Sequence, residues 1–310
     1  MNKKNVISVK NLNKTYSRKN NKPVFAINNL NLDVQEGEIF GLLGPNGAGK
    51  TTFINILAGT VMKGSGKINV WGFDIDINPR QVRASIGIVP QEVNLDPFFT
   101  PRMQLDLHAG LYGVKKKDKI TDSILKLVSL ESQADSYARS LSGGMKRRLL
   151  IAKALVHQPP ILILDEPTAG VDVNLRQNLW ENIKLLHSQG VTIILTTHYL
   201  EEAEKMCDRI GILNEGNLVA LDSTQNLLNK IKTKKVIFKV DKPINVKNYE
   251  LDSLKVLSAE NNKIIFSYEK NKIKIEEIIK VVQKNNVKII DISTDDGDLE
   301  EIFLELTKNK

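Results

Sequence analysis

Four short and almost uninterrupted apolar runs limit the folds that this sequence can adopt. They are EIFGLLG (38–44), SIGIVP (85–90), PILILDEP (160–167) and VTIILTTH (191–198). Strands of a parallel sheet are buried on both faces, so they read as continuous apolar runs. Helical patterns such as KTTFINILAG and MKRRLLIAKALVH lie between these runs. The sequence therefore predicts an α/β core with a mostly parallel sheet.

Two changes of pattern divide the rest of the chain. Strand signals are absent between Asp96 and Leu141, which predicts a helical subdomain over about residues 96–150. After about residue 222, lysine becomes more frequent and glycine almost disappears. We therefore expect two domains, residues 1–222 and a small α+β domain over residues 223–310.

The smaller domain has its own periodic segments. Strands are predicted at 234–240, 263–268 and 287–293, with a turn at Asn261-Asn262, and helices at 272–284 and 298–307. Asp298 is the expected cap of the last helix, whose apolar face comprises Leu299, Ile302, Phe303 and Leu306.

Composition excludes some classes of protein. No run of 18 apolar residues occurs, and the N-terminal MNKKNVISVKN lacks the apolar stretch of a signal peptide, so we expect neither a membrane span nor secretion. Cys207 is the single cysteine and is expected to be a small buried side chain in a reducing compartment. The net charge is +8, and seven Lys and Arg residues precede the first acid, Asp33. Without interleaved aromatics these charges favour a solvated surface over nucleic-acid binding, with attraction to an anionic membrane left open.

The segment GPNGAGKT (44–51) fits the pattern G-x-x-x-x-G-K-[ST] between a strand and a helix. Its glycines allow backbone N–H groups to surround phosphate oxygens, Lys50 can reach the β- and γ-phosphates, and Thr51 can ligate Mg²⁺. The segment is therefore predicted to bind a nucleoside triphosphate. The predicted phosphate-binding residues are Gly44, Pro45, Asn46, Gly47, Ala48, Gly49, Lys50, Thr51 and Thr52.

Acidic and imidazole side chains follow two other apolar runs. Asp165 ends the run at 161–165 and is predicted to lie near the metal, whereas Glu166 can polarise an attacking water. His198 ends another run and is a candidate hydrogen-bond donor to the γ-phosphate. The guanine-reading pattern N-K-x-D is absent, which favours adenine, and Tyr16 is a candidate to stack on it.

Together these stretches resemble the ATP-binding subunit of an ABC transporter, over essentially all of residues 6–222. The resemblance implies a P-loop NTPase fold of the ABC-cassette type. In the family's terms, Tyr16 is similar to the adenine-stacking aromatic, Gly44–Thr51 to the Walker A loop and Ile161–Asp165 to the Walker B strand. Gln91 resembles the Q-loop glutamine, which touches Mg²⁺, and Glu166, Asp172 and His198 resemble the catalytic glutamate, the D-loop aspartate and the switch histidine.

The stretch LSGGMKRR (141–148) provides a second anion-binding helix end, because Ser142 can cap a helix that starts near Gly144. The resemblance implies that Ser142, Gly143 and Gly144 cover the γ-phosphate of an ATP bound to another copy. Two copies would then form a head-to-tail homodimer with two shared sites.

Longer stretches look like the bacterial drug-exporter branch of the family, of the daunorubicin-resistance type. They include VPQEVNLDPFFTPRMQLDLHAGLYGV, EPTAGVDV and the terminal DLEEIFLELT. This resemblance implies an ATPase that uses ATP and Mg²⁺, dimerises beneath a separate integral-membrane permease on the cytoplasmic face of the bacterial inner membrane, and powers export, with no nucleic acid expected. A soluble ABC ATPase acting on ribosomes or nucleic acid and an importer subunit remain alternatives. The domain after residue 222 either docks the permease, stabilises the dimer or adds packing surface.

Overall fold

The computed structural model describes residues 4–17, 23–169, 173–231, 233–242, 254–260, 262–284, 287–295 and 297–308. The chain forms two compact units, Met1–Ser223 and Thr224–Lys310. The predicted D-loop residue Asp172 lies outside the described residues.

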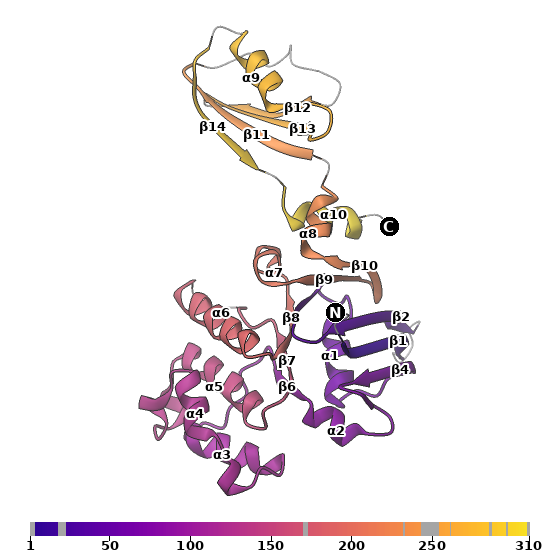
Figure 1. Ribbon diagram of the computed structural model, residues 1–310, viewed down its shortest axis with the longest axis vertical. Helices are drawn as coiled ribbons and strands as arrows, with labels where there is room; N and C mark the ends of the chain where they lie inside the picture. Colours follow the sequence, from indigo (N-terminus) through magenta and orange to yellow (C-terminus); the bar gives the residue numbers. More distant parts are fainter. Residues whose placement is uncertain are drawn as a thin grey trace. The chain divides into compact units, whose positions relative to one another are not determined.

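The first unit contains two sheets (Figure 1). An antiparallel sheet has the order β2-β1-β4-β5 and comprises β1 (Asn5–Tyr16), β2 (Val24–Gln35), β4 (Ser65–Val70) and β5 (Phe73–Asp74). A six-stranded sheet has the order β10-β9-β3-β8-β7-β6 and comprises β3 (Ile39–Leu43), β6 (Ile86–Val89), β7 (Ile161–Asp165), β8 (Thr192–Thr197), β9 (Arg209–Asn214) and β10 (Asn217–Ser223). All neighbours in the larger sheet are parallel except the hairpin pair β9 and β10. The predicted mostly parallel core is confirmed.

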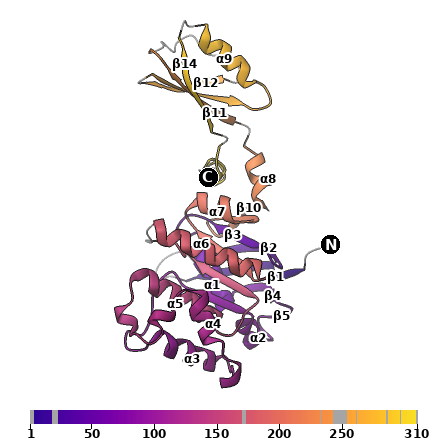
Figure 2. The same ribbon diagram turned by 60° about the vertical axis from the view of Figure 1, so that its left-hand side comes forward.

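The helices of the first unit lie on both sides of the larger sheet. They are α1 (Lys50–Ala58), α2 (Pro79–Ala84), α3 (Pro101–Leu111), α4 (Thr121–Leu127), α5 (Gly143–Leu155), α6 (Val173–Ser188) and α7 (Leu200–Met206), with short 3₁₀ turns at Lys116–Asp118, Glu131–Gln133 and Ala138–Ser140. Helices α3, α4 and α5 gather on one side of the larger sheet, away from β1, β2 and β4 (Figures 1 and 2). All described elements between β6 and β7 are helical, in agreement with the sequence pattern.

The main core joins the two sheets through α1. Phe53, Ile56 and Leu57 of α1 are at most 1% exposed and belong to one apolar cluster with Phe40 of β3 and Ile7 of β1. Burial of such side chains stabilises the folded state by roughly 1.5–3 kcal/mol each, which fixes α1 firmly. The loop that enters α1 is thereby held against the sheet.

The order of the parallel strands decides where the predicted site residues meet. Strands β3, β8, β7 and β6 are neighbours that run in the same direction, so their carboxyl ends share one edge. The loop at 44–49 follows β3, His198 follows β8, Asp165 and Glu166 lie at the end of β7, and Gln91 follows β6. Ligands of open α/β sheets bind at this edge.

The second unit contains an antiparallel sheet of order β12-β13-β11-β14. Its elements are α8 (Thr224–Asn229), β11 (Thr233–Val240), β12 (Leu254–Glu260), β13 (Lys263–Glu269), α9 (Ile275–Gln283), β14 (Ile289–Asp295) and α10 (Leu299–Lys308). Ile278 and Val282 of α9 share a buried cluster with Phe238 and Phe266 of the sheet. The unit therefore has an apolar core of its own.

The sequence missed one strand of this unit, β12. Only Leu254 of β12 is buried, so the strand has no clear alternation of apolar and polar residues. The predicted Asn-Asn turn falls between β12 and β13. Asn262 has a φ of 61°, and Asn261 lies outside the described residues. Two other predictions are confirmed. The Asp298 carboxylate accepts from the Glu301 N–H at 3.2 Å as a helix cap, and Cys207 is buried.

Candidate functional site

The loop Gly44–Gly49 leads from β3 into α1 and holds a buried ammonium group. Lys50 is 5% exposed, and its Nζ donates to the carbonyl oxygens of Gly44 at 2.6 Å and Pro45 at 3.1 Å. Burial lowers the pKa of Lys50, and the nearby Glu166 and Asp165 carboxylates oppose this shift. Pro45, Asn46 and Gly47 are exposed, as are Thr51 and, partly, Thr52. The loop therefore presents backbone groups and a cation at a helix N-terminus, which is an anion-binding arrangement.

Other strands approach the back of this loop so closely that side chains would not fit. Gly49 has a φ of 107°, and a Cβ there would lie 2.3 Å from the Ala26 carbonyl oxygen of β2. A Cβ on Gly44 would lie 2.4 Å from the Leu213 carbonyl oxygen of β9. Glycine at these positions allows the loop to pack against backbone on two sides.

The turn between β9 and β10 also bonds to the loop. The Gly216 N–H donates to the Ala48 carbonyl oxygen at 3.1 Å, and the Asn28 N–H of β2 donates to the Gly216 carbonyl oxygen at 2.9 Å. Asn28 and Asn217 join the same strand and turn through their side chains at 2.9 Å. The sequence analysis missed this support, because residues 48 and 216 are joined only by the fold.

This support predicts a selective effect of Gly216→Ala on nucleotide binding. At a φ of 79°, the new Cβ would lie 3.1 Å from the carbonyl oxygens of Ala26 and Phe25, so the turn or strand β2 must shift, which should disturb the Gly216–Ala48 hydrogen bond. Loss of one backbone hydrogen bond should weaken ATP binding about threefold to tenfold. Titration with a fluorescent ATP analogue measures the change.

Gly72→Ala is the matched control for Gly216→Ala. Gly72 has a φ of 87° in a turn where Trp71 also has positive φ, as Glu215 does before Gly216, but a Cβ on Gly72 would meet no atom within 4 Å. Both substitutions should therefore lower the melting temperature through backbone strain. Equal ATP affinities of the two variants would contradict the role of Gly216.

The end of β7 carries two carboxylates in different environments. Asp165 is 6% exposed, and its Oδ1 accepts from the Thr196 hydroxyl of β8 at 2.5 Å. Burial raises the pKa of Asp165, and the nearby Glu166 charge raises it further. The Thr196 hydrogen bond and the Lys50 and Arg147 charges lower it. Two acids and two cations thus share this edge of the sheet.

The Glu166 carboxylate joins the ends of three strands. Its Oε2 accepts from the Gln91 amide Nε2 at 2.9 Å and lies 3.3 Å from His198 Nδ1. The structure therefore brings Gln91, Glu166 and His198 together, although they are far apart in the sequence. A carboxylate oriented in this way can accept a proton from a water molecule.

The backbone at Glu166 is also unusual. Its φ is 46°, a left-handed conformation that costs a non-glycine residue of the order of 1–3 kcal/mol. The Glu166 N–H donates to the backbone and hydroxyl oxygens of Thr196, each at 3.1 Å. Strand β8 therefore fixes the direction in which the Glu166 side chain leaves the sheet.

Arg147 of α5 is a site residue that the sequence analysis did not identify. This side chain is 5% exposed and donates to the carbonyl oxygens of Gln91 at 2.7 Å, Glu166 at 2.7 Å and Pro167 at 3.0 Å. Burial lowers its pKa, against the pull of Asp165 and Glu166. The spacing of buried positions in α5, at 144, 147, 151 and 154, could have revealed it, because that face points into the core.

The N-terminus of α5 is open. Ser142 caps the helix, since its hydroxyl accepts from the Met145 N–H at 3.3 Å. A Cβ on Gly143 would meet no atom within 4 Å, whereas Gly144 is buried. Among the described residues, no hydrogen bond joins Ser142 or Gly143 to Glu166. The exposed end of α5 is therefore a second candidate anion-binding surface.

Tyr16 lies at the end of β1, beside the strand that backs the loop. It is 39% exposed, and the Lys14 ammonium lies 4.9 Å from the centre of its ring. Its cross-strand neighbour is Val24, two residues before Ala26, whose carbonyl borders Gly49. The exposed Phe25, between Val24 and Ala26, is a second aromatic surface here that the sequence analysis did not single out.

The described residues contain no group of three or more His, Cys, Asp or Glu side chains that could hold a metal ion. Thr51 and Asp165 nevertheless flank the loop end, and Lys50 lies close enough to Asp165 to affect its pKa. Mg²⁺ is usually held by one or two protein oxygens together with phosphate oxygens and waters, and not by an all-protein cage. The residues present fit that kind of site.

Comparisons with known proteins agree with this geometry. Residues 27–169 match the family described as ABC transporter. Nod factor export ATP-binding protein I of Rhizobium sp. (strain N33) is 45% identical over 206 residues, 66% of this chain and 68% of that protein. Linearmycin resistance ATP-binding protein LnrL of Bacillus subtilis (strain 168) is 33% identical over 97% of this chain and 98% of that protein.

Solved structures show the same fold. The structure of an ATP-binding subunit of an ABC transporter has a TM-score of 0.64 and 28% identity, covering 73% of this chain and 92% of that chain. The post-hydrolysis dimer of the ATP-binding cassette MJ0796 with ADP and Pi has a TM-score of 0.63 and 28% identity, covering 70% of this chain and 98% of that chain. The described residues contain no helix long and apolar enough to cross a membrane. This chain therefore belongs to the ABC transporter family and is an ATP-binding, ATP-hydrolysing member of it.

Proposed function

We propose that this chain is the ATPase subunit of an exporter and that it works beneath a separate membrane permease. The observation that carries the proposal is the match to the linearmycin resistance protein, which extends over 97% of this chain and so includes the second unit. Several other relatives are named Nod factor export ATP-binding proteins. In this proposal the permease, and not this chain, selects the exported compound.

In this proposal the loop after β3 binds the triphosphate. Backbone N–H groups of Gly44–Thr51 and the first turn of α1 surround the phosphates, and the buried Lys50 ammonium moves from its own loop carbonyls to the β- and γ-phosphate oxygens. Tyr16 stacks on adenine. Thr51, Gln91 and Asp165 would hold Mg²⁺ together with phosphate oxygens and waters. When bound, Mg²⁺ supplies charge neutralisation of the phosphates.

Glu166 is the proposed acceptor of the proton of the attacking water. Gln91 and His198 support the assignment because both contact Glu166 Oε2 and so fix its orientation. Thr196 and Arg147 hold the Glu166 backbone from either side. His198 also lies at the strand end from which it can donate to the γ-phosphate.

A head-to-tail homodimer completes the site in this proposal. Ser142, Gly143 and Gly144 of one copy cover the γ-phosphate held by the other copy, with Asp172 at the contact. The open N-terminus of α5 and the dimeric MJ0796 structures support it. Shifting an open–closed equilibrium from about 1:99 to 99:1 requires roughly 5.5 kcal/mol, so each of two ATP molecules contributes about half. Hydrolysis removes the bridging contact and reopens the pair.

The membrane partner is the part of the proposal that an isolation experiment tests. The tagged chain, expressed in its own host, should be recovered from detergent-solubilised membranes together with an integral-membrane protein. In this proposal the chain binds that protein at the cytoplasmic face of the membrane. Mass spectrometry of the purified complex identifies that partner. Recovery with ribosomes or nucleic acid instead would replace the exporter by a soluble ABC ATPase, and recovery with an extracellular solute-binding protein would indicate an importer.

A further inference from the structure

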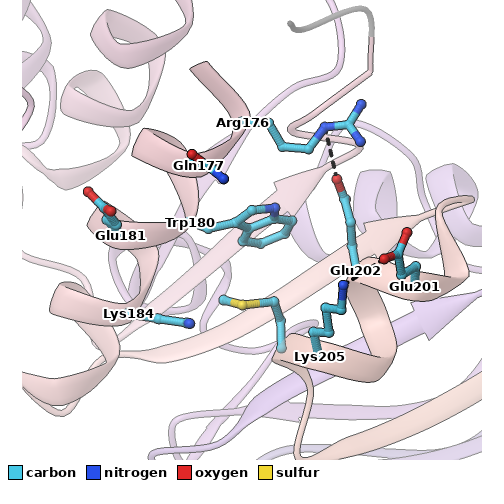
Figure 3. Close-up of a pocket in the computed structure, with 9 residues that line it drawn as sticks. Arg176, Gln177, Trp180, Glu181, Lys184, Glu201, Glu202 and Lys205 are labelled. Atoms are coloured by element: carbon cyan, nitrogen blue, oxygen red, sulfur yellow. Dashed lines mark hydrogen bonds and ion pairs between the residues drawn. The ribbon is translucent and has the colours of Figure 1, made fainter. Parts of the chain in front are cut away.

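A buried carboxylate on α7, Glu202, is connected to both Glu166 and His198 through neighbouring residues. Glu202 is 8% exposed, and its Oε2 accepts from the Thr168 hydroxyl at 2.7 Å. Its Oε1 lies 3.3 Å from Arg176 Nε of α6 (Figure 3). One side chain therefore joins α7, α6 and the turn after β7.

The Thr168 contact leads to Glu166. Thr168 is fully buried and lies two residues after Glu166, and the Pro167 carbonyl between them is held by Arg147 Nε at 3.0 Å. Glu166 has a strained left-handed backbone, and such a conformation persists only where surrounding contacts hold it. Glu202 therefore holds the far end of the turn that carries Glu166.

The Arg176 contact leads to His198. The Arg176 guanidinium carbon lies 4.9 Å from the centre of the Tyr199 ring, and the Tyr199 and His198 ring centres are 4.1 Å apart. His198 Nδ1 in turn lies 3.3 Å from Glu166 Oε2. Together with the peptide chain from Glu166 to Thr168, these contacts form a closed circuit through Glu202, Arg176, Tyr199 and His198 back to Glu166.

The link between α6 and α7 is incomplete as a hydrogen bond. Arg176 Nε and Glu202 Oε1 are buried atoms without a hydrogen-bond partner among the described residues, although their charges are 3.3 Å apart. Burial raises the pKa of Glu202, opposed by Thr168, Arg176 and Trp180. The Arg176 side chain is 32% exposed and the Glu202 side chain 9% exposed, so this partly exposed ion pair contributes little to stability.

A cavity of about 570 Å³ borders this pair, lined by α6 and α7 side chains that include Trp180 and Lys184 (Figure 3). The Arg176–Glu202 pair therefore borders open space on one side and is not enclosed by packed side chains.

We propose that Glu202 is a positioning residue for ATP hydrolysis. Its carboxylate connects α6 and α7 to the turn that carries Glu166. The inference rests on the proposed role of Glu166. It assigns Glu202 no contact with ATP, so its loss should lower kcat and leave KM nearly unchanged. Misplacing a catalytic group by about 1 Å can reduce the rate roughly a hundredfold.

Glu202→Gln and Glu201→Gln form a matched pair of variants. Both remove one negative charge from adjacent residues of α7, but Glu201 is exposed and forms a surface ion pair with Lys205 at 2.6 Å. We expect kcat of Glu202→Gln to fall about tenfold to a hundredfold, with KM for ATP within about twofold, whereas Glu201→Gln retains the wild-type values. Steady-state ATPase assays on the full chain with Mg²⁺ measure both constants.

Thr168→Ser and Thr168→Val test the same link if Glu202→Gln fails to fold. The serine hydroxyl can still donate to Glu202, so Thr168→Ser should retain kcat, whereas Thr168→Val should lose it. Because both residues act through one contact, Thr168→Val combined with Glu202→Gln should be no slower than the slower single variant.

Wild-type kcat in both Glu202→Gln and Thr168→Val, with Glu166→Gln inactive, would overturn the role of Glu202 and leave the proposed function intact. A raised KM at constant kcat would overturn it also, since that result indicates a binding role. Wild-type turnover by Glu166→Gln would instead remove the catalytic role on which the inference rests.

Discussion

Glu166→Gln should abolish ATP turnover while ATP binding persists. The amide keeps the size of the carboxylate but cannot accept the proton of the attacking water, so the rate should fall about 10²- to 10⁴-fold. Without hydrolysis the ATP-bound closed dimer cannot reopen by cleavage. The variant should therefore accumulate as a dimer in ATP, which size-exclusion chromatography with light scattering detects.

The geometry of Glu166 makes this substitution a clean test. The residue's left-handed backbone is held by Thr196 and Arg147 through main-chain atoms, which glutamine retains. Its melting temperature should therefore stay close to wild type, and Glu181→Gln on α6 serves as a control for loss of one acidic charge. A variant that binds ATP, is inactive and stays monomeric would show that Glu166 has another role.

A mixture of two inactive variants should regain ATPase activity. Lys50→Ala removes the phosphate-binding cation, and Gly143→Asp places a carboxylate where the γ-phosphate of the other copy should approach. Gly143 is the better position than Gly144, because it is exposed with open space around it, whereas Gly144 is buried in α5. Each variant alone should be inactive.

Random pairing makes about half of the dimers mixed, and each mixed dimer has one intact composite site, so about a quarter of all sites are whole. Activity should return to as much as that fraction of the wild-type rate if one site turns over alone. Subunit exchange is verified by pull-down with two different affinity tags. A covalently linked dimer with one intact site serves as the control for turnover by a single site. If that dimer is active but the mixed dimers form and stay inactive, α5 does not act on the ATP of the other copy.

The sequence determined the local elements of the site. The continuous apolar runs predicted β3, β6, β7 and β8, because strands buried on both faces need apolar residues at every position. The spacing at 44–51 predicted a glycine loop before a helix, and α1 begins at Lys50. The Ser142 cap of α5 was also readable, since capping depends on residues three positions apart.

Strand β12 and the partners of several site residues were not readable in the same way. Strand β12 has one buried residue, so its pairing with β13 and not its own pattern makes it a strand. The contacts of Gly216 with Ala48, of Arg147 with Gln91 and of Glu202 with Thr168 join residues that are distant in sequence.

These contacts exist because β3, β8, β7 and β6 lie in that order, which differs from their order along the chain. Local sequence patterns record helical and strand periodicity and turn preferences, but strand order is chosen by the packing of the whole unit. The sequence by itself thus predicted which groups bind phosphate or activate water, and these roles remain proposals. The tertiary structure decided that Gln91, Glu166 and His198 meet, and which buried side chains hold them, because only the folded sheet brings four strand ends to one edge.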